Sequence, residues 1–230
     1  MAGIWPAVHA ERHSLIRDLK LLPPESWAVP SLCRGWDIHD VLAHLVDDAK
    51  TTRLGFVRDF VAAGFDFDRA SARGVARHRA ENPERTLAEF QTVSGRTTSA
   101  PAPLATRLVE VFVHGEDIRR PLGICRDYPA AHVGTALRYQ LATTVKFSGG
   151  KERAAGLRLV ATDADISIGA GPEVRGSAIA LLLAVSGRPL HEGAHGRRGR
   201  RVGWLGLSSC RRSASRPGSP CGRSRNTAPG

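Results

Sequence analysis

Apolar residues recur every three to four positions through most of the first 147 residues, which is the spacing of amphipathic helices. The pattern predicts helices at 8–22, 38–64, 82–98, 104–123 and 128–147. Asp37 is placed as the N-cap of the second helix, with Asp40 three residues later in a capping box. The charged, glycine-containing stretch 65–82 is predicted to be a loop or a frayed helix.

The pattern changes after residue 147. Two short β-type runs, "LRLVATD" and "ISIGAG", are followed by an apolar helix in "GSAIALLLAVSGRP" that Gly-Arg-Pro ends. We therefore expect a helical bundle at 1–147 and a small α+β domain at 148–190 that ends early. Residues 191–230 are rich in Arg, Gly and Ser and lack periodicity, which predicts a disordered tail or a frame-shifted sequence.

The positive charge is concentrated in this tail. The chain has a formal net charge of +11, of which residues 191–230 supply +8 through nine Arg and one Glu, so the rest of the chain has +3. A nucleic-acid arm in the tail is an alternative to a flexible basic tail, but nucleic acid is not the expected partner. No apolar run approaches the roughly 18 residues of a membrane span, and the start lacks a signal-peptide pattern. We expect no membrane association and a cytoplasmic location.

One predicted helix has an unusual polar strip. In 104–123 the residues Arg107, Glu110, His114 and Asp117 fall between two apolar faces. Polar groups enclosed in this way need partners, and a carboxylate and an imidazole one turn apart can bind the same metal ion. A Glu–His pair on a partly exposed helix face is the simpler alternative. His44, on the second helix, is the natural third ligand, although neighbouring acidic residues also allow a polar surface there.

The other candidate groups are weaker. His9 and His13 lie one turn apart in a strongly charged, solvated setting, and His39 and His132 are predicted at the surface. Trp36 is expected to pack against the start of the second helix. The four cysteines show no C-x-x-C or zinc-ribbon spacing, and a disulfide framework is not expected in a chain this long and poor in cysteine, so we expect reduced thiols.

Three segments together resemble a known family. "SLCRGWDIHDVLAHL", "LVEVFVHGEDIRRPLG" and "LRLVATDADISIGAGPEVRGSAIALLLAVSGRP" are similar to the mycothiol-dependent maleylpyruvate isomerase family, and the resemblance covers 11–189. It implies a mostly α fold, a DinB-like four-helix bundle with a small C-terminal α+β segment. It also implies a divalent metal site, usually zinc, at His44, Glu110 and His114, with a fourth position left open as in catalytic zinc sites.

The resemblance further implies a chemistry. Mycothiol would be the thiol cosubstrate, and coordination of its sulfur to the metal would produce a thiolate at neutral pH. In the isomerase this thiolate adds to the cis double bond of maleylpyruvate, the resulting single bond rotates, and the thiol leaves; other relatives look like thiol transferases. The partners would thus be a small-molecule substrate and a low-molecular-weight thiol.

Asp117, Arg119 and Arg188 are predicted to support the metal ligands or to bind the substrate. Asp117 could orient a ligand imidazole or an arginine, and the two arginines could bind substrate carboxylates. For Arg119 the alternative is a charge that complements the helix C-terminus. A non-catalytic metal-binding module, either a thiol-sensing regulator or a damaged copy, is the alternative to an enzyme, because the tail replaces the segment that usually completes the small domain.

Overall fold

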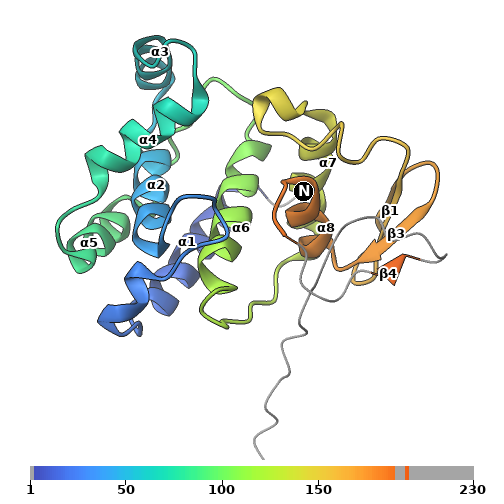
Figure 1. Cartoon of the computed structure of the whole chain (residues 1–230), viewed down its shortest axis with the longest axis horizontal. Coiled ribbons are helices and arrows are strands. Elements are labelled where there is room, and N and C mark those ends of the chain that lie inside the picture. The colour runs from blue at the N-terminus through green and yellow to red at the C-terminus, as the bar shows by residue number, and fades with distance from the viewer. Residues whose placement is uncertain (1–2, 190–194, 197–230) are drawn as a thin grey trace, which may run out of the picture.

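The computed structural model describes residues 3–189 and 195–196 (Figure 1). The α-helices in this part are α1 (Ile4–Leu19), α2 (Ile38–Lys50), α3 (Arg53–Ala62), α4 (Phe67–His78), α5 (Pro83–Val93), α6 (Ala105–Arg119), α7 (Ala130–Ala142) and α8 (Ala178–Val185). Two short 3₁₀ helices lie at Pro24–Ala28 (η1) and Val145–Phe147 (η2). The fold is therefore mostly helical, as predicted.

Helices α1, α2, α5 and α6 pack together as a bundle, and α7 and α8 extend it on the side of α6. One apolar core fills the space between α1, α2 and α5, and a second lies among α6, α7, α8 and the sheet. Helix α6 contributes to both, with Ile118 in the first core and Leu108, Val111 and Phe112 in the second. Within the described ranges, every helix is too short or too polar to cross a membrane.

The capping box predicted for α2 is confirmed. The Asp37 carboxylate accepts from the Asp40 backbone N–H at 2.7 Å, and the Asp37 N–H donates to the Asp40 carboxylate at 3.1 Å. These two bonds satisfy amide groups that the first turn of a helix leaves without partners. They fix the start of α2 and, with it, the position of every side chain along that helix.

The prediction of one helix over 38–64 is wrong. Helix α2 ends at Lys50, and α3 begins at Arg53 after Thr52 caps it by accepting from the Gly55 N–H at 3.1 Å. Threonine competes well with helical backbone bonds at such a position, so the pair Thr51–Thr52 divides the predicted helix in two. For the stretch 65–82, where a loop or a frayed helix was predicted, the structure has the helix α4, which Asp66 caps.

His39 was expected at the surface but is buried, with 3 % of its surface exposed. It lies on the face of α2 that packs against α5, where its Nε2 is 2.8 Å from the Thr86 hydroxyl. Burial, with a further contribution from Arg79, lowers the pKa of His39 to about 4, so this imidazole is a neutral core group.

The C-terminal part of the described chain forms a small mixed sheet beside α8 (Figure 1). Its strands are β1 (Arg158–Ala161), β2 (Ser167–Gly169), β3 (Glu173–Gly176) and β4 (His195–Gly196), in the order β2-β1-β3-β4. Strands β1 and β3 pair in parallel, whereas β1 with β2 and β3 with β4 pair antiparallel. The sequence pattern predicts β1 and β2 but not β3, which is short and polar. Apart from β4, the predicted tail at 191–230 lies outside the described residues.

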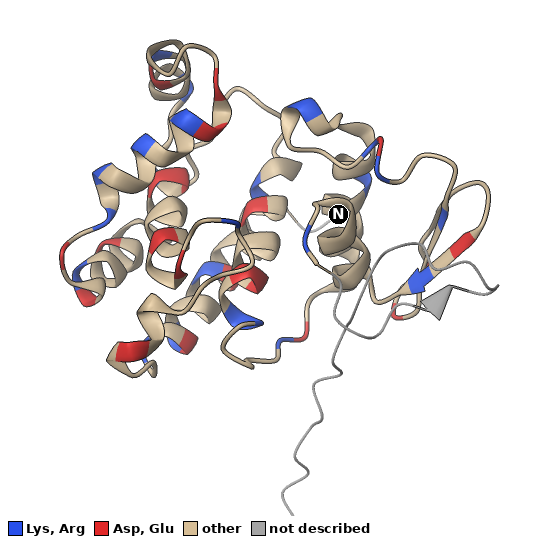
Figure 2. Cartoon of the chain, in the orientation of Figure 1, with Lys and Arg blue, Asp and Glu red and all other residues tan. Residues whose placement is uncertain are grey.

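Positively and negatively charged residues are interspersed over the visible helices, in keeping with the near balance of charge predicted outside the tail (Figure 2).

A buried ionic cluster lies inside the bundle. Asp48 of α2 pairs with Arg107 of α6 and lies 3.6 Å from the Arg12 guanidinium of α1. Arg12 also donates to the backbone carbonyls of Ser94 and Arg96, at 3.3 and 3.0 Å. The cluster thus ties α1, α2 and α6 to the end of α5.

Replacing the shared carboxylate should destabilise the fold strongly. Asp48→Asn leaves two buried guanidinium groups without their counter-charge, and we expect the free energy of unfolding to fall by about 3–5 kcal/mol in urea denaturation. Asp47→Asn is the matched control, because Asp47 neighbours Asp48 but pairs with partly exposed groups on α4; it should cost less than about 1 kcal/mol. Equal effects of the two substitutions would contradict a central role for the cluster.

Candidate metal centre

The packing of α2 against α6 brings His44, Glu110 and His114 together. His44 Nε2 lies 3.4 Å from Glu110 Oε2, and His114 Nε2 lies 3.1 Å from the same oxygen. The two imidazole rings meet edge to face, with centroids 4.7 Å apart. The three side chains remain 13–26 % exposed, so the cluster is partly open to solvent.

These atoms fit a divalent metal ion. One nitrogen or oxygen from each residue lies within 4.8 Å of the others, which is close enough for a single ion to contact all three. Ligand atoms around a tetrahedral ion with bonds of about 2.1 Å lie about 3.4 Å apart, which matches the two measured separations. Two imidazoles and one carboxylate are also a donor set that zinc accepts. Three protein donors leave a coordination position for another molecule.

The second nitrogen of His114 binds Asp117. His114 Nδ1 lies 2.9 Å from Asp117 Oδ2, and the Asp117 carboxylate is fully buried. Arg188, just after α8, donates to both oxygens of Asp117, at 2.9 and 2.6 Å. A hydrogen bond of this kind fixes which imidazole nitrogen is free to face the cluster. The structure thus links Glu110, His114, Asp117 and Arg188 in one polar chain.

Arg188 reaches Asp117 because of the turn that ends α8. Gly187 has φ +80°, a conformation that glycine adopts readily and other residues adopt at a cost. Arg188 also donates from Nη1 to the Ser186 carbonyl at 3.1 Å, and its side chain remains 18 % exposed. The guanidinium is therefore held in place while part of it still faces solvent.

Mutual hydrogen bonds set the charge states in this chain of residues. Burial alone would raise the pKa of Glu110, but bonds with His114 and His44 lower that pKa well below its usual value. Burial likewise disfavours the charged form of His114, but its bonds to Asp117 and Glu110 raise its pKa to about 9. The pKa of Asp117 is lowered because Arg188 and His114 outweigh its burial. Without metal, the cluster is an imidazolium between two carboxylates.

The comparisons with known proteins agree with this architecture. Residues 8–91 match the family model described as the mycothiol maleylpyruvate isomerase N-terminal domain. The match spans 84 of the 230 residues. Two crystal structures of the mycothiol-dependent maleylpyruvate isomerase, one of them a histidine-to-alanine mutant, are similar to the chain, with TM-scores of 0.57 and 0.56 at 18 % and 17 % identity. Each similarity covers 84 % of this chain and 91 % of the other, and it shows the shared fold. No curated protein matches the chain.

The maleylpyruvate isomerase fold brings together five of the six residues predicted for the site. His44, Glu110 and His114 form the cluster, and Asp117 and Arg188 extend it. The exception is Arg119, which is fully buried elsewhere with Glu11, Asp18 and Tyr128. Five residues beyond His114, Arg119 is turned by about 140° around the axis of α6 and faces α1 instead. Its charge holds two helices together and is not available to a substrate at the cluster.

Two residues of the segment 8–91 were not predicted to lie at the site. The Trp36 ring packs against His44, with centroids 5.2 Å apart, in addition to preceding α2. Cys33 lies beside His114 and Asp117, with ligand atoms of all three within 4.8 Å of one another. Periodicity could not place them because both lie in a loop. The only local signal is their position within the same family-like motif as His44.

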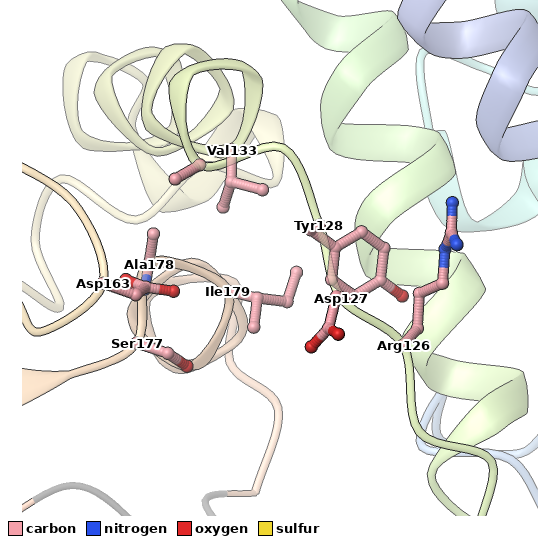
Figure 3. Close-up of a pocket in the computed structure, with 9 residues that line it drawn as sticks. Arg126, Asp127, Tyr128, Val133, Asp163, Ser177, Ala178 and Ile179 are labelled. Carbon is pink, nitrogen blue, oxygen red and sulfur yellow. The ribbon is translucent and has the colours of Figure 1, made fainter.

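The site is separate from a cavity of about 290 Å³ that lies between α8, the start of α7 and the connection that precedes α7 (Figure 3). Arg126, Tyr128, Val133 and Ile179 are among its lining residues, and none of the cluster residues lines it. The chemistry of the cluster therefore depends on its own side chains and not on the residues that line this cavity.

In the metal-free protein, His114 should remain protonated up to about pH 9. The pKa of His114 in the folded protein lies above its value of about 6.5 in the unfolded chain. The paired imidazolium therefore contributes its full stabilisation below about pH 6.5. This stabilisation is lost as the pH rises through about 9. NMR of the imidazole nitrogens would measure the titration, and Asp117→Asn should lower the His114 pKa. A wild-type midpoint near the unperturbed value would contradict the pairing.

Proposed function

We propose that the protein is a zinc-dependent enzyme of the mycothiol-dependent maleylpyruvate isomerase type, acting as an isomerase or a thiol transferase. His44, Glu110 and His114 would hold the metal. The observation that carries this proposal is the convergence of these three donors within 4.8 Å, with Glu110 Oε2 3.4 Å from His44 and 3.1 Å from His114, on a fold shared with the isomerase. A bound zinc ion supplies a thiolate at neutral pH by lowering the pKa of a coordinated thiol.

The residues of the chain prepare the site for such a thiol. Asp117 accepts from His114 Nδ1, which leaves Nε2 directed at the cluster. Binding of a metal requires the loss of the His114 proton, and the Asp117 carboxylate then favours the tautomer that keeps hydrogen on Nδ1. The Trp36 ring packs against the His44 imidazole, with centroids 5.2 Å apart, and helps to hold that ligand in place.

Arg188 is the group that would bind a substrate carboxylate. Its Nε and Nη2 donate to Asp117, and one Nη1 hydrogen donates to Ser186, so two of the five guanidinium hydrogens have no acceptor among the described residues and could bind a ligand. A planar guanidinium held by a buried carboxylate loses little further freedom when it binds a second one. Arg188 would thus place an unsaturated acid next to the thiolate, where the double bond can be attacked.

Metal content tests the ligand set. Protein purified without added metal should contain about one zinc ion by elemental analysis. His44→Ala, Glu110→Ala and His114→Ala should each lose it, because two donors hold zinc much more weakly than three. His13→Ala is the control, since His13 bonds to Ser94 outside the cluster. Wild-type protein that takes up no metal after reconstitution would contradict the proposal.

Turnover tests the enzymatic role. Zinc-loaded protein should isomerise maleylpyruvate only when mycothiol is present, as followed by ultraviolet absorbance. Arg188→Met should lower kcat/KM for the acid by about 10- to 100-fold, the effect of one charge-assisted bond, with metal content unchanged. Arg188→Lys should recover part of the loss. Full metal binding without thiol-dependent turnover of isomerase or transferase substrates would favour a non-catalytic metal-binding module instead.

A further inference from the structure

We propose that Cys33 is an exchangeable fourth ligand of the metal, which occupies the open position until a small thiol displaces it. This inference rests on the proposed metal site. Cys33 is a free thiol and forms a set with His114 and Asp117 that could itself hold an ion. His114 belongs to both possible sets, so the sulfur lies beside a residue of the principal cluster.

Coordination by Cys33 would require its side chain to rotate toward the cluster. The Cys33 sulfur lies within 4.8 Å of a His114 nitrogen and an Asp117 oxygen. A tetrahedral ion with a zinc–sulfur bond of about 2.3 Å and a zinc–nitrogen bond of about 2.1 Å keeps the two ligand atoms about 3.6 Å apart. Cys33 forms no set with His44 and Glu110 at the 4.8 Å limit, so rotation about χ1 would have to carry the sulfur toward these two residues before it reaches ligand distance.

The backbone around Cys33 is firmly held. The Ser31 hydroxyl accepts from the Cys33 N–H at 3.1 Å and donates to the Trp36 carbonyl at 2.8 Å, while the Trp36 N–H donates to the Cys33 carbonyl at 3.1 Å. The Leu32 N–H donates to the Asp117 carbonyl of α6 at 3.2 Å. The turn is thus attached to the helix that carries two of the proposed ligands, and the thiol cannot move far from them.

The charges also favour a thiolate at the ion. One carboxylate and two neutral imidazoles leave a divalent ion with one positive charge, which a thiolate from Cys33 would neutralise. Burial raises the pKa of the free Cys33 thiol to about 11 and Arg188 opposes this shift only in part, so the thiolate would form through coordination to the ion. Thiolate sulfur is moreover a preferred zinc ligand.

The exchange balances chemically. The entering thiol loses its proton and forms a metal–sulfur bond, the bond to Cys33 breaks, and the Cys33 sulfur takes up the proton. One metal–sulfur bond replaces another, and no oxidant or reductant is required. Cys33 would therefore help to retain the metal and keep water from its fourth position while the cosubstrate is absent. A thiol, rather than water, would displace it.

Cobalt substitution tests this role without measuring catalysis. Wild-type protein loaded with Co²⁺ should show a sulfur-to-cobalt charge-transfer band in the near ultraviolet, and Cys33→Ser should lose it while keeping the visible bands of bound cobalt. Cys125 is disulfide-bonded, contrary to the expectation of reduced thiols, so His13→Ala serves as the control and should retain the charge-transfer band. Zinc affinity, measured against a chromophoric chelator, should fall by about tenfold or more in Cys33→Ser.

Alkylation of Cys33 provides a second measurement. Peptide mapping after iodoacetamide treatment should show Cys33 protected in the zinc-loaded protein and labelled after zinc is removed. Identical cobalt spectra for wild type and Cys33→Ser, together with equal labelling with and without zinc, would overturn the role of Cys33 and leave the three-residue site intact. Failure of the wild type to bind cobalt or zinc would overturn the metal site and, with it, this inference.

Discussion

The polar strip of α6 is the constraint on which the rest of the structure depends. Arg107, Glu110, His114 and Asp117 lie on a helix whose other faces are packed in two apolar cores. Each of these side chains needs a partner there, because an unpaired polar group in such surroundings costs about 1–3 kcal/mol or more. The partners come from different parts of the chain: Asp48 and His44 from α2, and Arg188 from the turn after α8. Satisfying the strip therefore fixes how both neighbouring elements dock on α6.

The same constraint explains why the sequence predicted the centre of the site well. Glu110 and His114 are one turn apart on a regular helix, so their proximity follows from helical geometry alone. His44 also follows a regular period on α2, whose start the Asp37 capping box fixes. The family-like motifs agreed with these positions. The periodicity of α2 and α6 thus predicted which face of each helix carries the site residues. It did not predict how the two helices pack against each other.

The sequence predicted less where tertiary contacts decide. Nothing local shows that Arg119 pairs with Glu11 and Asp18, or that His39 lies against Thr86. The break at Thr51–Thr52 depends on capping that competes with an apolar period, and the period is continuous enough to hide it. Cys33 reaches the site only because its loop bonds to the backbone of α6. In each case the deciding partner is distant along the chain.

The separation of the ligands along the chain has a consequence for folding. His44 and Glu110 are 66 residues apart, and the family-matched segment 8–91 contains the first but not the second. An ion held by both would close a long loop, so it would act as a cross-link between the two halves of the bundle. Such an ion binds the native chain and not the unfolded one, which makes its binding energy part of the stability of the fold. The two apolar cores, which share residues of α1 and α6, would then resist separation through a bond that neither core contains.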